Sequence, residues 1–181
     1  VIMDEASKMN KLVKNLLTLN QLESGKDAPV MERFDIVSLI KGVIGSMHIV
    51  IEQKEATVIF EETEPVYVWA DEFKTEEVVT NYTSNALNHL DGERKVEIKV
   101  LHEGDCVKVT VFNTGTPIPE EDIPNLWNKF YKVDKARTRE YGGSGIGLSI
   151  VKAIVEGMNQ KYGVCNYDNG VEFWFTLDCR Q

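Results

Sequence analysis

Hydrophobic residues near the start of the chain recur at the spacing of an amphipathic helix. The repeat is carried by Ile2, Met9, Leu12, Val13, Leu16, Leu17 and Leu19. A helix this short, with no partner helix in the same sequence, would leave its apolar stripe wet, so the pattern favours self-association. Gly25 and Pro29 then predict the end of the helix and a linker. The predicted organisation is a helical segment at 1–25 followed by a domain at 26–181.

Helical and alternating patterns follow one another along the rest of the chain. Asp35 and Asp71 stand where N-caps are expected, directly before two apolar-periodic stretches. The patterns predict helices at 36–54, 72–90 and 144–158, and strands at 30–34, 56–61, 66–69, 95–101, 106–112, 162–166 and 171–177. Together they predict a two-layer α/β sandwich, in which one mixed sheet carries three helices on one face and is preceded by one long helix.

Residues 113–141 stand apart because they are rich in charge and proline and show little periodicity beyond a short helix predicted at 123–130. The stretch is far longer than the usual connection between elements. Connections of this length are commonly lids or disordered segments. We therefore expect a lid or a disordered segment in this part of the chain.

Composition limits the classes of function that the chain can have. Its 181 residues are 43% hydrophobic and carry a formal charge of −9, which fits one domain with an appendage and argues against nucleic acid as a partner. No apolar run approaches the roughly 20 residues of a membrane helix, and the N-terminus lacks the order of a signal peptide, so we expect a soluble chain. Cys106, Cys165 and Cys179 lie in apolar runs and are expected to be buried thiols in a reducing compartment.

Three asparagines on the helix predicted at 72–90 are candidates for a ligand site. Asn81, Asn85 and Asn88 are spaced i, i+4 and i+7 and therefore share one face of the helix. Each asparagine costs roughly 0.5 to 0.7 kcal/mol relative to alanine in a helix, so three in line favour a shared use. Uncharged amide oxygens suit a Mg²⁺ ion that keeps water and phosphate ligands, because a carboxylate there would repel the phosphates. A polar face without a ligand is the alternative.

A glycine-rich stretch opens the helix predicted at 144–158. Gly143, Gly145 and Gly147 allow backbone N–H groups to approach phosphates at the positive end of the helix dipole. A dinucleotide-binding motif would need a strand directly before the glycines, and a P-loop would need Gly-Lys-Ser/Thr; the sequence pattern offers neither. A flexible hinge before a core helix remains the alternative to an anion site.

Two further motifs lie between the asparagines and the glycines, namely Asn113-Thr-Gly115 and Phe130-Tyr131-Lys132. In this order the four motifs resemble the N-box, first glycine box, F-box and second glycine box of sensor histidine kinases. The stretch 9–25 is similar to the second helix of that family's dimerisation and phosphoacceptor hairpin. The resemblance covers nearly the whole chain and implies a catalytic ATP-binding domain of the GHKL superfold, with ATP and Mg²⁺ as cofactors.

The resemblance also implies roles for the matching positions. Asn85 would hold Mg²⁺, while Lys132 and Arg137 would contact the β- and γ-phosphates. Phe130 and Tyr131 would pack the lid against the body of the domain. The candidate catalytic residues are Asn81, Asn85, Lys132 and Arg137. The implied ATP site comprises Asn81, Asn85, Asn88, His89, Asn113, Gly115, Ile118, Tyr131, Lys132, Arg137, Gly143, Gly145, Ile146, Gly147 and Leu148.

The sequence departs from the family pattern at three places. Asn113 stands where the family usually has an aspartate that binds the adenine amino group, although an amide can still accept one hydrogen bond and donate another. Pro117 replaces a glycine and removes an N–H group. The family commonly has Lys followed by Tyr or His where this chain has Asn88 followed by His89, so one cationic phosphate contact is missing or is supplied by His89.

The implied function is donation of the γ-phosphoryl group of Mg-ATP to a histidine of the phosphoacceptor helix. His48, His89 and His102 do not match the phosphoacceptor motif. The alternatives are a nucleotide-binding module without catalysis and an ATPase of the same superfold. ATPases of the gyrase and Hsp90 type carry a glutamate general base at the position of Asn81, and an amide cannot take a proton from water, so hydrolysis is expected to be slow.

The resemblance further implies partners and a location. The partners would be the phosphoacceptor hairpin of the same kinase, a response-regulator receiver domain, and a second copy in a homodimer of the intact protein. The chain would be the cytoplasmic domain of a protein in the bacterial cell membrane. The lid sequence at 130–137 and the Asn-Thr-Gly variant are similar to Gram-positive sensors of the glycopeptide (vancomycin) resistance type.

Overall fold

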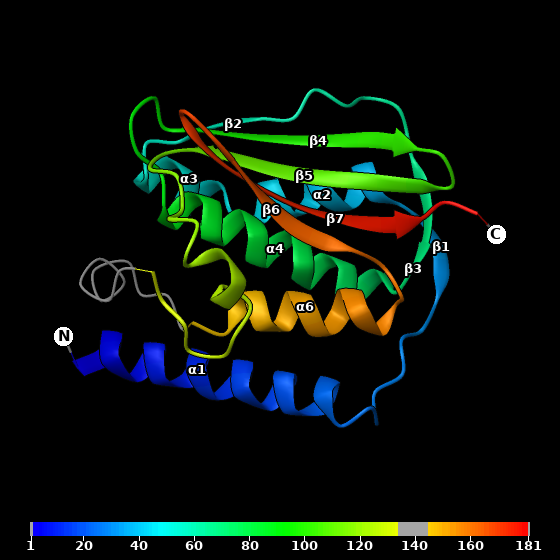
Figure 1. Cartoon of the computed structure of the whole chain (residues 1–181), viewed down its shortest axis with the longest axis horizontal. Helices are drawn as coiled ribbons and strands as arrows, with labels where there is room; N and C mark the ends of the chain where they lie inside the picture. Colours follow the sequence, from blue (N-terminus) through cyan, green and yellow to red (C-terminus); the bar gives the residue numbers. More distant parts are fainter. Residues whose placement is uncertain (1, 134–144, 181) are drawn as a thin grey trace.

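The computed structural model describes residues 2–133 and 145–180 and arranges them as a mixed sheet with helices on one side (Figure 1). The helices are α1 (Ile2–Glu23), α2 (Ile36–Ser46), α3 (His48–Gln53), α4 (Glu72–Asn88) and α6 (Gly147–Gly157), with a 3₁₀ turn η1 (Ile123–Asn125). The strands are β1 (Glu32–Asp35), β2 (Thr57–Ile59), β3 (Tyr67–Ala70), β4 (Lys95–Glu103), β5 (Cys106–Thr114), β6 (Tyr162–Tyr167) and β7 (Gly170–Asp178). The predicted two-layer α/β sandwich, preceded by one long helix, is confirmed.

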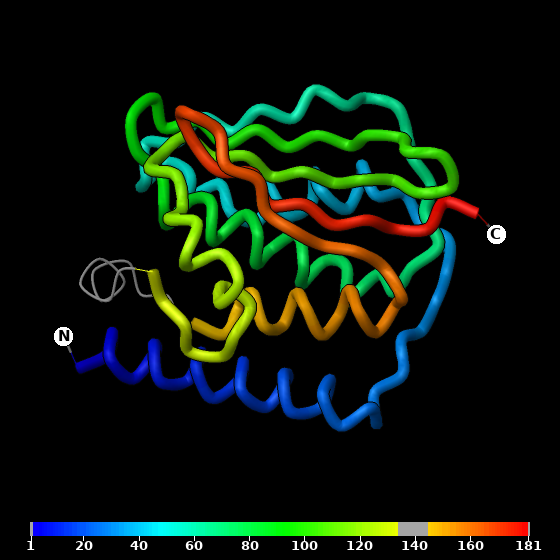
Figure 2. Tube along the Cα trace, viewed as in Figure 1, coloured from blue at the N-terminus to red at the C-terminus, as the bar shows by residue number. Residues whose placement is uncertain are grey.

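The strands follow the order β1-β3-β7-β5-β4-β2, and β6 pairs with β7 beside this path (Figure 2). The β2–β4 pair is parallel and the other pairs are antiparallel, which makes the sheet mixed. Alternate residues of the central strands point toward the helices and are buried, as the period of two requires. Those of β4 and β5 are Val96, Ile98, Val100, Val107, Val109 and Val111.

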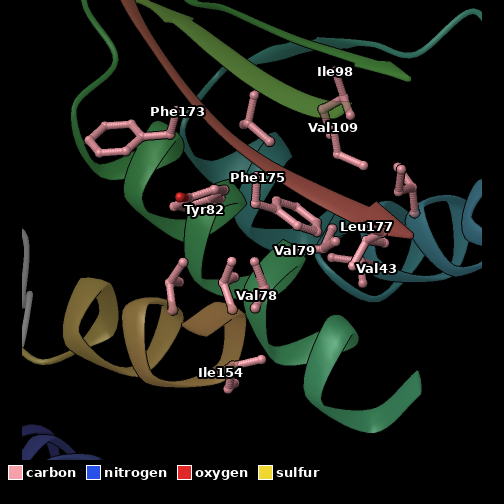
Figure 3. Close-up of a cluster of buried hydrophobic side chains, with 14 of the residues drawn as sticks. Val43, Val78, Val79, Tyr82, Ile98, Val109, Ile154, Phe173, Phe175 and Leu177 are labelled. Atoms are coloured by element: carbon pink, nitrogen blue, oxygen red, sulfur yellow. The ribbon is translucent and has the colours of Figure 1, made fainter. Parts of the chain in front are cut away.

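The core lies between the sheet and α4. Val78, Val79 and Tyr82 of α4 face Phe173, Phe175 and Leu177 of β7, and Ile154 reaches the same cluster from α6 (Figure 3). Helix α6 packs on α4, and α2 packs on the other side of α4. This packing holds α4 and the first turn of α6 in a fixed relation, on which the candidate site depends.

Aspartate caps begin both of the helices for which they were predicted. The Asp35 carboxylate accepts hydrogen bonds from Val37 N and Val66 N, each at 3.0 Å. Burial alone would raise the pKa of Asp35, but the hydrogen bonds from Val66 and from the first turn outweigh it and lower the pKa. Asp71 accepts from Lys74 N at 3.1 Å and from Val30 N at 2.8 Å. The second bond also fixes the linker to the start of α4.

Several predicted boundaries were wrong. The helix predicted at 36–54 is broken at Met47, where the backbone has φ −101° and ψ 9°. Gly45 and Ser46 precede the break, and both are poorer helix formers than alanine. The helix predicted at 123–130 is only the turn η1. The strands predicted at 30–34 and 56–61 are instead β1 and the three-residue β2.

Helix α1 has a partner in the same chain, contrary to the prediction. Leu19 is buried, and Leu12, Leu16 and Leu22 pack beside it against the core, along α6 (Figure 1). Glu23 at the end of the helix accepts a hydrogen bond from Lys129 Nζ at 2.7 Å. The neighbouring part of the stripe remains exposed and comprises Ile2, Met9, Val13 and Leu17. Self-association through this exposed part stays a prediction.

The predictions from composition have mixed outcomes. Cys165 is exposed and Cys106 and Cys179 are half-buried, so the expectation of buried thiols was wrong. These cysteines lie at an outward position or near the end of a strand, where alternation alone does not give burial. Within 2–133 and 145–180, no helix has the length and apolar character needed to cross a membrane.

Candidate nucleotide site

The predicted row of amides is present on α4. Asn81, Asn85 and Asn88 are all half-buried, on the face of α4 that does not enter the core. His89 is the C-cap of the helix and is exposed, and its N–H donates to Asn85 O at 3.2 Å. The row therefore lies along one accessible edge of a helix whose other face is fixed by the core.

The amide row meets the glycine-rich stretch at Gly147, the first residue of α6. A Cβ atom placed on Gly147 would lie 3.2 Å from Asn81 Oδ1, which is tighter than an ordinary contact. Two motifs that are far apart in the sequence thus meet in space, because the Asn81 side-chain oxygen lies beside the N-terminus of α6. A side chain at 147 would occupy the space between the two motifs.

The N-terminus of α6 has the features of an anion site. Ile146, the N-cap residue, is fully buried, and no side chain of a described residue caps the helix. The first turn holds no acidic residue, so nothing in it opposes a negative ligand near the positive end of the dipole. Ser149 Oγ donates to Trp127 O at 3.1 Å, which ties this turn to the segment before it. Leu148 is half-buried.

Gly145 brings the third motif to the same place. Its φ is +72°, and a Cβ on Gly145 would lie 2.9 Å from Phe130 Cα and 3.4 Å from Lys132 Cε. Phe130 N donates to Gly145 O at 2.8 Å. Lys132 therefore lies near the start of α6, and its contact with phosphates stays a prediction. Arg137 and Gly143 lie outside the described residues.

One aromatic residue of the third motif, Phe130, differs from the prediction. Phe130 is 56% exposed, so more than half of its surface is not covered by the body of the domain. Its backbone has φ +63°, and the bond to Gly145 holds this unusual conformation in place. The Tyr131 hydroxyl donates to the Asp122 carboxylate, and this hydrogen bond raises the pKa of Tyr131.

Asn113 and Gly115 join the end of β5 to the end of α4. Asn113 is buried, and its Nδ2 donates to His89 O at 3.3 Å and to Thr114 O at 3.2 Å. Both acceptors are carbonyl oxygens, so the NH₂ group must face them and the Oδ1 atom must point away. A Cβ on Gly115 would lie 2.6 Å from His89 O, which only glycine avoids. The strand end and the helix end are therefore in direct contact.

A cavity of about 380 Å³ opens beside this junction. It is lined by Asp91, Gly92, Glu93, Thr114, Gly115, Thr116 and Asn169. The cavity borders Gly115 but includes none of the α4 amides. The cavity therefore lies at the margin of the candidate site. The centre of the site is better placed where Asn81 meets Gly147.

Sequence reasoning missed two residues that hold the segment between the first and third motifs. Asn166 of β6 forms two hydrogen bonds with the backbone of Ile118, and Trp127 packs beside Tyr82 of α4. Neither residue lies in a recognisable motif. The proline on each side of Ile118 was a signal, because it leaves Ile118 as the one N–H donor of that tripeptide.

Replacing Asn113 by aspartate is expected to lower the free energy of unfolding by about 1–3 kcal/mol. The substitution restores the usual residue of the family, yet a carboxylate would face the carbonyl oxygens of His89 and Thr114 without a proton to donate. Urea denaturation at pH 7.5 would measure the loss. Asn169→Asp, at an exposed turn near the same junction, is the matched control for the added charge. An Asn113→Asp protein as stable as this control would contradict the assignment of the amide.

Comparison with known proteins agrees with this geometry. The family model of histidine kinase-, DNA gyrase B- and HSP90-like ATPases matches residues 70–181, which is more than half of the chain. The sensor protein kinase WalK of Staphylococcus saprophyticus is 30% identical over 99% of this chain, and that of Staphylococcus aureus is 29% identical over the same share. The chain spans 30% of the S. saprophyticus protein and 44% of the S. aureus one.

Solved structures show the same architecture. The catalytic domain of histidine kinase ThkA is 29% identical with a TM-score of 0.73, covering 83% of this chain and 96% of that domain. ThkA in complex with the response regulator protein TrrA is 27% identical with a TM-score of 0.79, covering 99% of this chain and 49% of that one. The family match at residues 70–181 spans the positions of the four motifs. The chain therefore belongs to the family of histidine kinase-, DNA gyrase B- and HSP90-like ATPases.

Proposed function

We propose that this chain binds Mg-ATP and donates the γ-phosphoryl group within a sensor histidine kinase of a two-component system. The observation that carries the proposal is the contact of Asn81 with Gly147. It places the amide row of α4 beside the N-terminus of α6, and Gly145 brings Lys132 to the same place. The similarity to sensor protein kinases over 99% of the chain supports the kinase reading over the other members of the family.

The donor set of the site fits a magnesium–nucleotide ligand. The amide oxygens of Asn81 and Asn85 are neutral and half-buried, and the first turn of α6 carries no acid that would repel a triphosphate. Mg²⁺ held by Asn85 would supply charge neutralisation at the phosphates. The backbone of α6 would bind the phosphate chain, and Lys132 would hold the terminal phosphate in line with the acceptor.

The transfer forms a bond between phosphorus and a nitrogen of the acceptor histidine and breaks the bond between the γ-phosphorus and the β,γ-bridging oxygen, so that ADP leaves. Asn81 cannot take a proton from water, which keeps hydrolysis slow and distinguishes this activity from that of an ATPase. Steady release of phosphate from ATP without an acceptor would favour the ATPase instead. Binding without transfer to an acceptor hairpin would favour a nucleotide-binding module.

We also propose partners and a location for the intact protein. ThkA has been solved in complex with a response regulator, which supports a receiver domain as the partner of this kinase. The acceptor would be the phosphoacceptor hairpin of the same kinase, in a homodimer of the intact protein. The parent protein would lie in the bacterial cell membrane with this part in the cytoplasm. A role in glycopeptide resistance stays a prediction.

Asn85→Ala is expected to weaken binding of a non-hydrolysable ATP analogue at least tenfold in the presence of Mg²⁺, because the amide oxygen that holds the ion is lost. Calorimetric titration with and without Mg²⁺ measures the effect. Asn20→Ala, which removes an exposed amide from α1, is the matched control and should bind as the wild-type chain does. If the wild-type chain does not bind the analogue at millimolar concentration, the proposed function fails.

A further inference from the structure

The Asn166 side chain on β6 makes a paired contact with one backbone residue. Asn166 Oδ1 accepts from Ile118 N at 2.9 Å, and Asn166 Nδ2 donates to Ile118 O at 2.7 Å. The amide thus bonds Ile118 as a neighbouring strand would. Pro117 and Pro119 on either side carry no N–H group, so Ile118 has the one amide hydrogen of this tripeptide. Asn166 binds both backbone polar groups of a residue that follows shortly after β5 ends at Thr114.

The rest of this segment is also held to the body of the domain. Trp127 packs its ring against Tyr162, Phe173 and Tyr82, with centroid distances of 4.6, 5.8 and 6.4 Å. Leu126 is buried, and Trp127 O accepts from Ser149 at the first turn of α6. The segment 116–130 is therefore fixed near its start by Asn166, in its middle by Trp127, and at its end by the Phe130–Gly145 bond. Residues 116–130 of the predicted lid are thus held at three points in this structure, and their movement as a lid stays a prediction.

We propose that Asn166 is a positioning residue of the nucleotide site, which holds Ile118 and the segment 116–130 as a fixed wall. The proposal rests on the function proposed above, because Ile118 becomes part of a binding wall only if the site binds a nucleotide. Asn166 itself touches no ligand and acts through Ile118. A wall that is already in place does not have to be ordered when the ligand binds, so part of the entropic cost of binding is avoided.

Only an amide meets both requirements of this position. The side chain must accept from an N–H and donate to a carbonyl across one short span, and asparagine carries both groups on one planar unit. Leucine has a similar shape and can do neither. Aspartate keeps the acceptor for Ile118 N but turns a second carboxylate oxygen toward Ile118 O. Asn166→Leu therefore removes both hydrogen bonds to Ile118, whereas Asn166→Asp removes only the one to Ile118 O.

The anchor can be tested without any nucleotide by hydrogen exchange. A proteolytic peptide covering 116–119 reports only the amide of Ile118, because Thr116 supplies its N-terminal amine and the two prolines have no N–H. Asn166→Leu is expected to speed exchange in this peptide at least tenfold, and Asn166→Asp by a smaller factor, while peptides of β7 keep the wild-type rate. Cys165 is an exposed neighbour of Asn166 on the same strand, and Cys165→Ser is the matched control. This control should leave the exchange rates of the 116–119 peptide and of the β7 peptides unchanged.

The role in the site is tested on the same proteins. Asn166→Leu is expected to raise the dissociation constant of the ATP analogue about tenfold. In phosphoryl transfer to an added acceptor hairpin, it should raise KM for ATP and leave kcat unchanged. A merely structural role would instead lower the thermal midpoint and the fraction of active protein with KM unchanged. If the leucine variant fails to fold, Asn166→Asp serves for both measurements.

The outcomes separate the two proposals. If the wild-type chain binds the analogue and Asn166→Leu shows faster exchange but wild-type affinity, the positioning role is refuted while the proposed function stands. Unchanged exchange in the 116–119 peptide of a folded variant refutes the anchor itself. If the wild-type chain binds no analogue, the proposed function fails, and the exchange result still decides whether Asn166 fixes the segment.

Discussion

Gly145→Ala is expected to weaken binding of an ATP analogue by about 100-fold or more, a loss of roughly 2.7 kcal/mol of binding free energy. Two effects add at this position. The backbone has φ +72°, where a residue with a Cβ costs roughly 1–2 kcal/mol, and the new Cβ would lie 2.9 Å from Phe130 Cα. A backbone atom cannot yield without moving its chain, so Phe130 and the nearby Lys132 would leave the N-terminus of α6. Calorimetric titration measures the affinity.

Gly157→Ala at the other end of α6 is the matched control for this prediction. A Cβ on Gly157 would meet no atom within 4 Å, and the residue ends the same helix. Its affinity should equal that of the wild-type chain. Thermal denaturation of both variants separates a local change from unfolding. Affinity of a folded Gly145→Ala protein within threefold of wild type would show that the junction of Gly145 with Phe130 does not shape the site.

The elements that the sequence predicted well are those whose signals are local. Asp35 and Asp71 cap α2 and α4 as expected, because a cap needs only its own first turn. The strands of the central sheet follow from alternation, since each must bury one face. The contact between the four motifs could be predicted only from their combined order, because no one of them indicates what it touches.

The features that escaped prediction depend on residues distant in sequence. The segment 116–130 is long and aperiodic, but it is fixed by Asn166, by the rings around Trp127 and by Gly145, which all come later in the chain or from other elements. The partner of α1 is α6, which a search for a second heptad pattern does not find, because α6 presents an ordinary core face. The length and periodicity of a segment are properties of that segment only, so they cannot predict which distant residues will pack against it.

Tyr82→Ala is expected to lower the free energy of unfolding by about 3–5 kcal/mol, the range for deleting a large buried ring. Tyr82 is completely buried at the centre of α4, and its ring packs on Phe173 and Phe175 at 5.4 and 5.9 Å between centroids. Its hydroxyl donates to Trp174 O at 3.0 Å, and burial raises its pKa well above the usual value. Urea denaturation followed by far-UV circular dichroism measures the loss.

Tyr82→Phe separates the hydroxyl from the ring and tests whether the two faces of α4 act independently. Removing the donor leaves Trp174 O without this hydrogen bond, so the loss should be about 1–3 kcal/mol. Because Tyr82 and Asn81 are adjacent and point to different faces of the helix, the phenylalanine variant should bind the ATP analogue as wild type does at temperatures where it is folded. Weaker binding by that folded variant would mean that the core face sets the position of the amide row more finely than the static packing indicates. Wild-type affinity with reduced stability would instead assign stability to one face of α4 and ligand binding to the other.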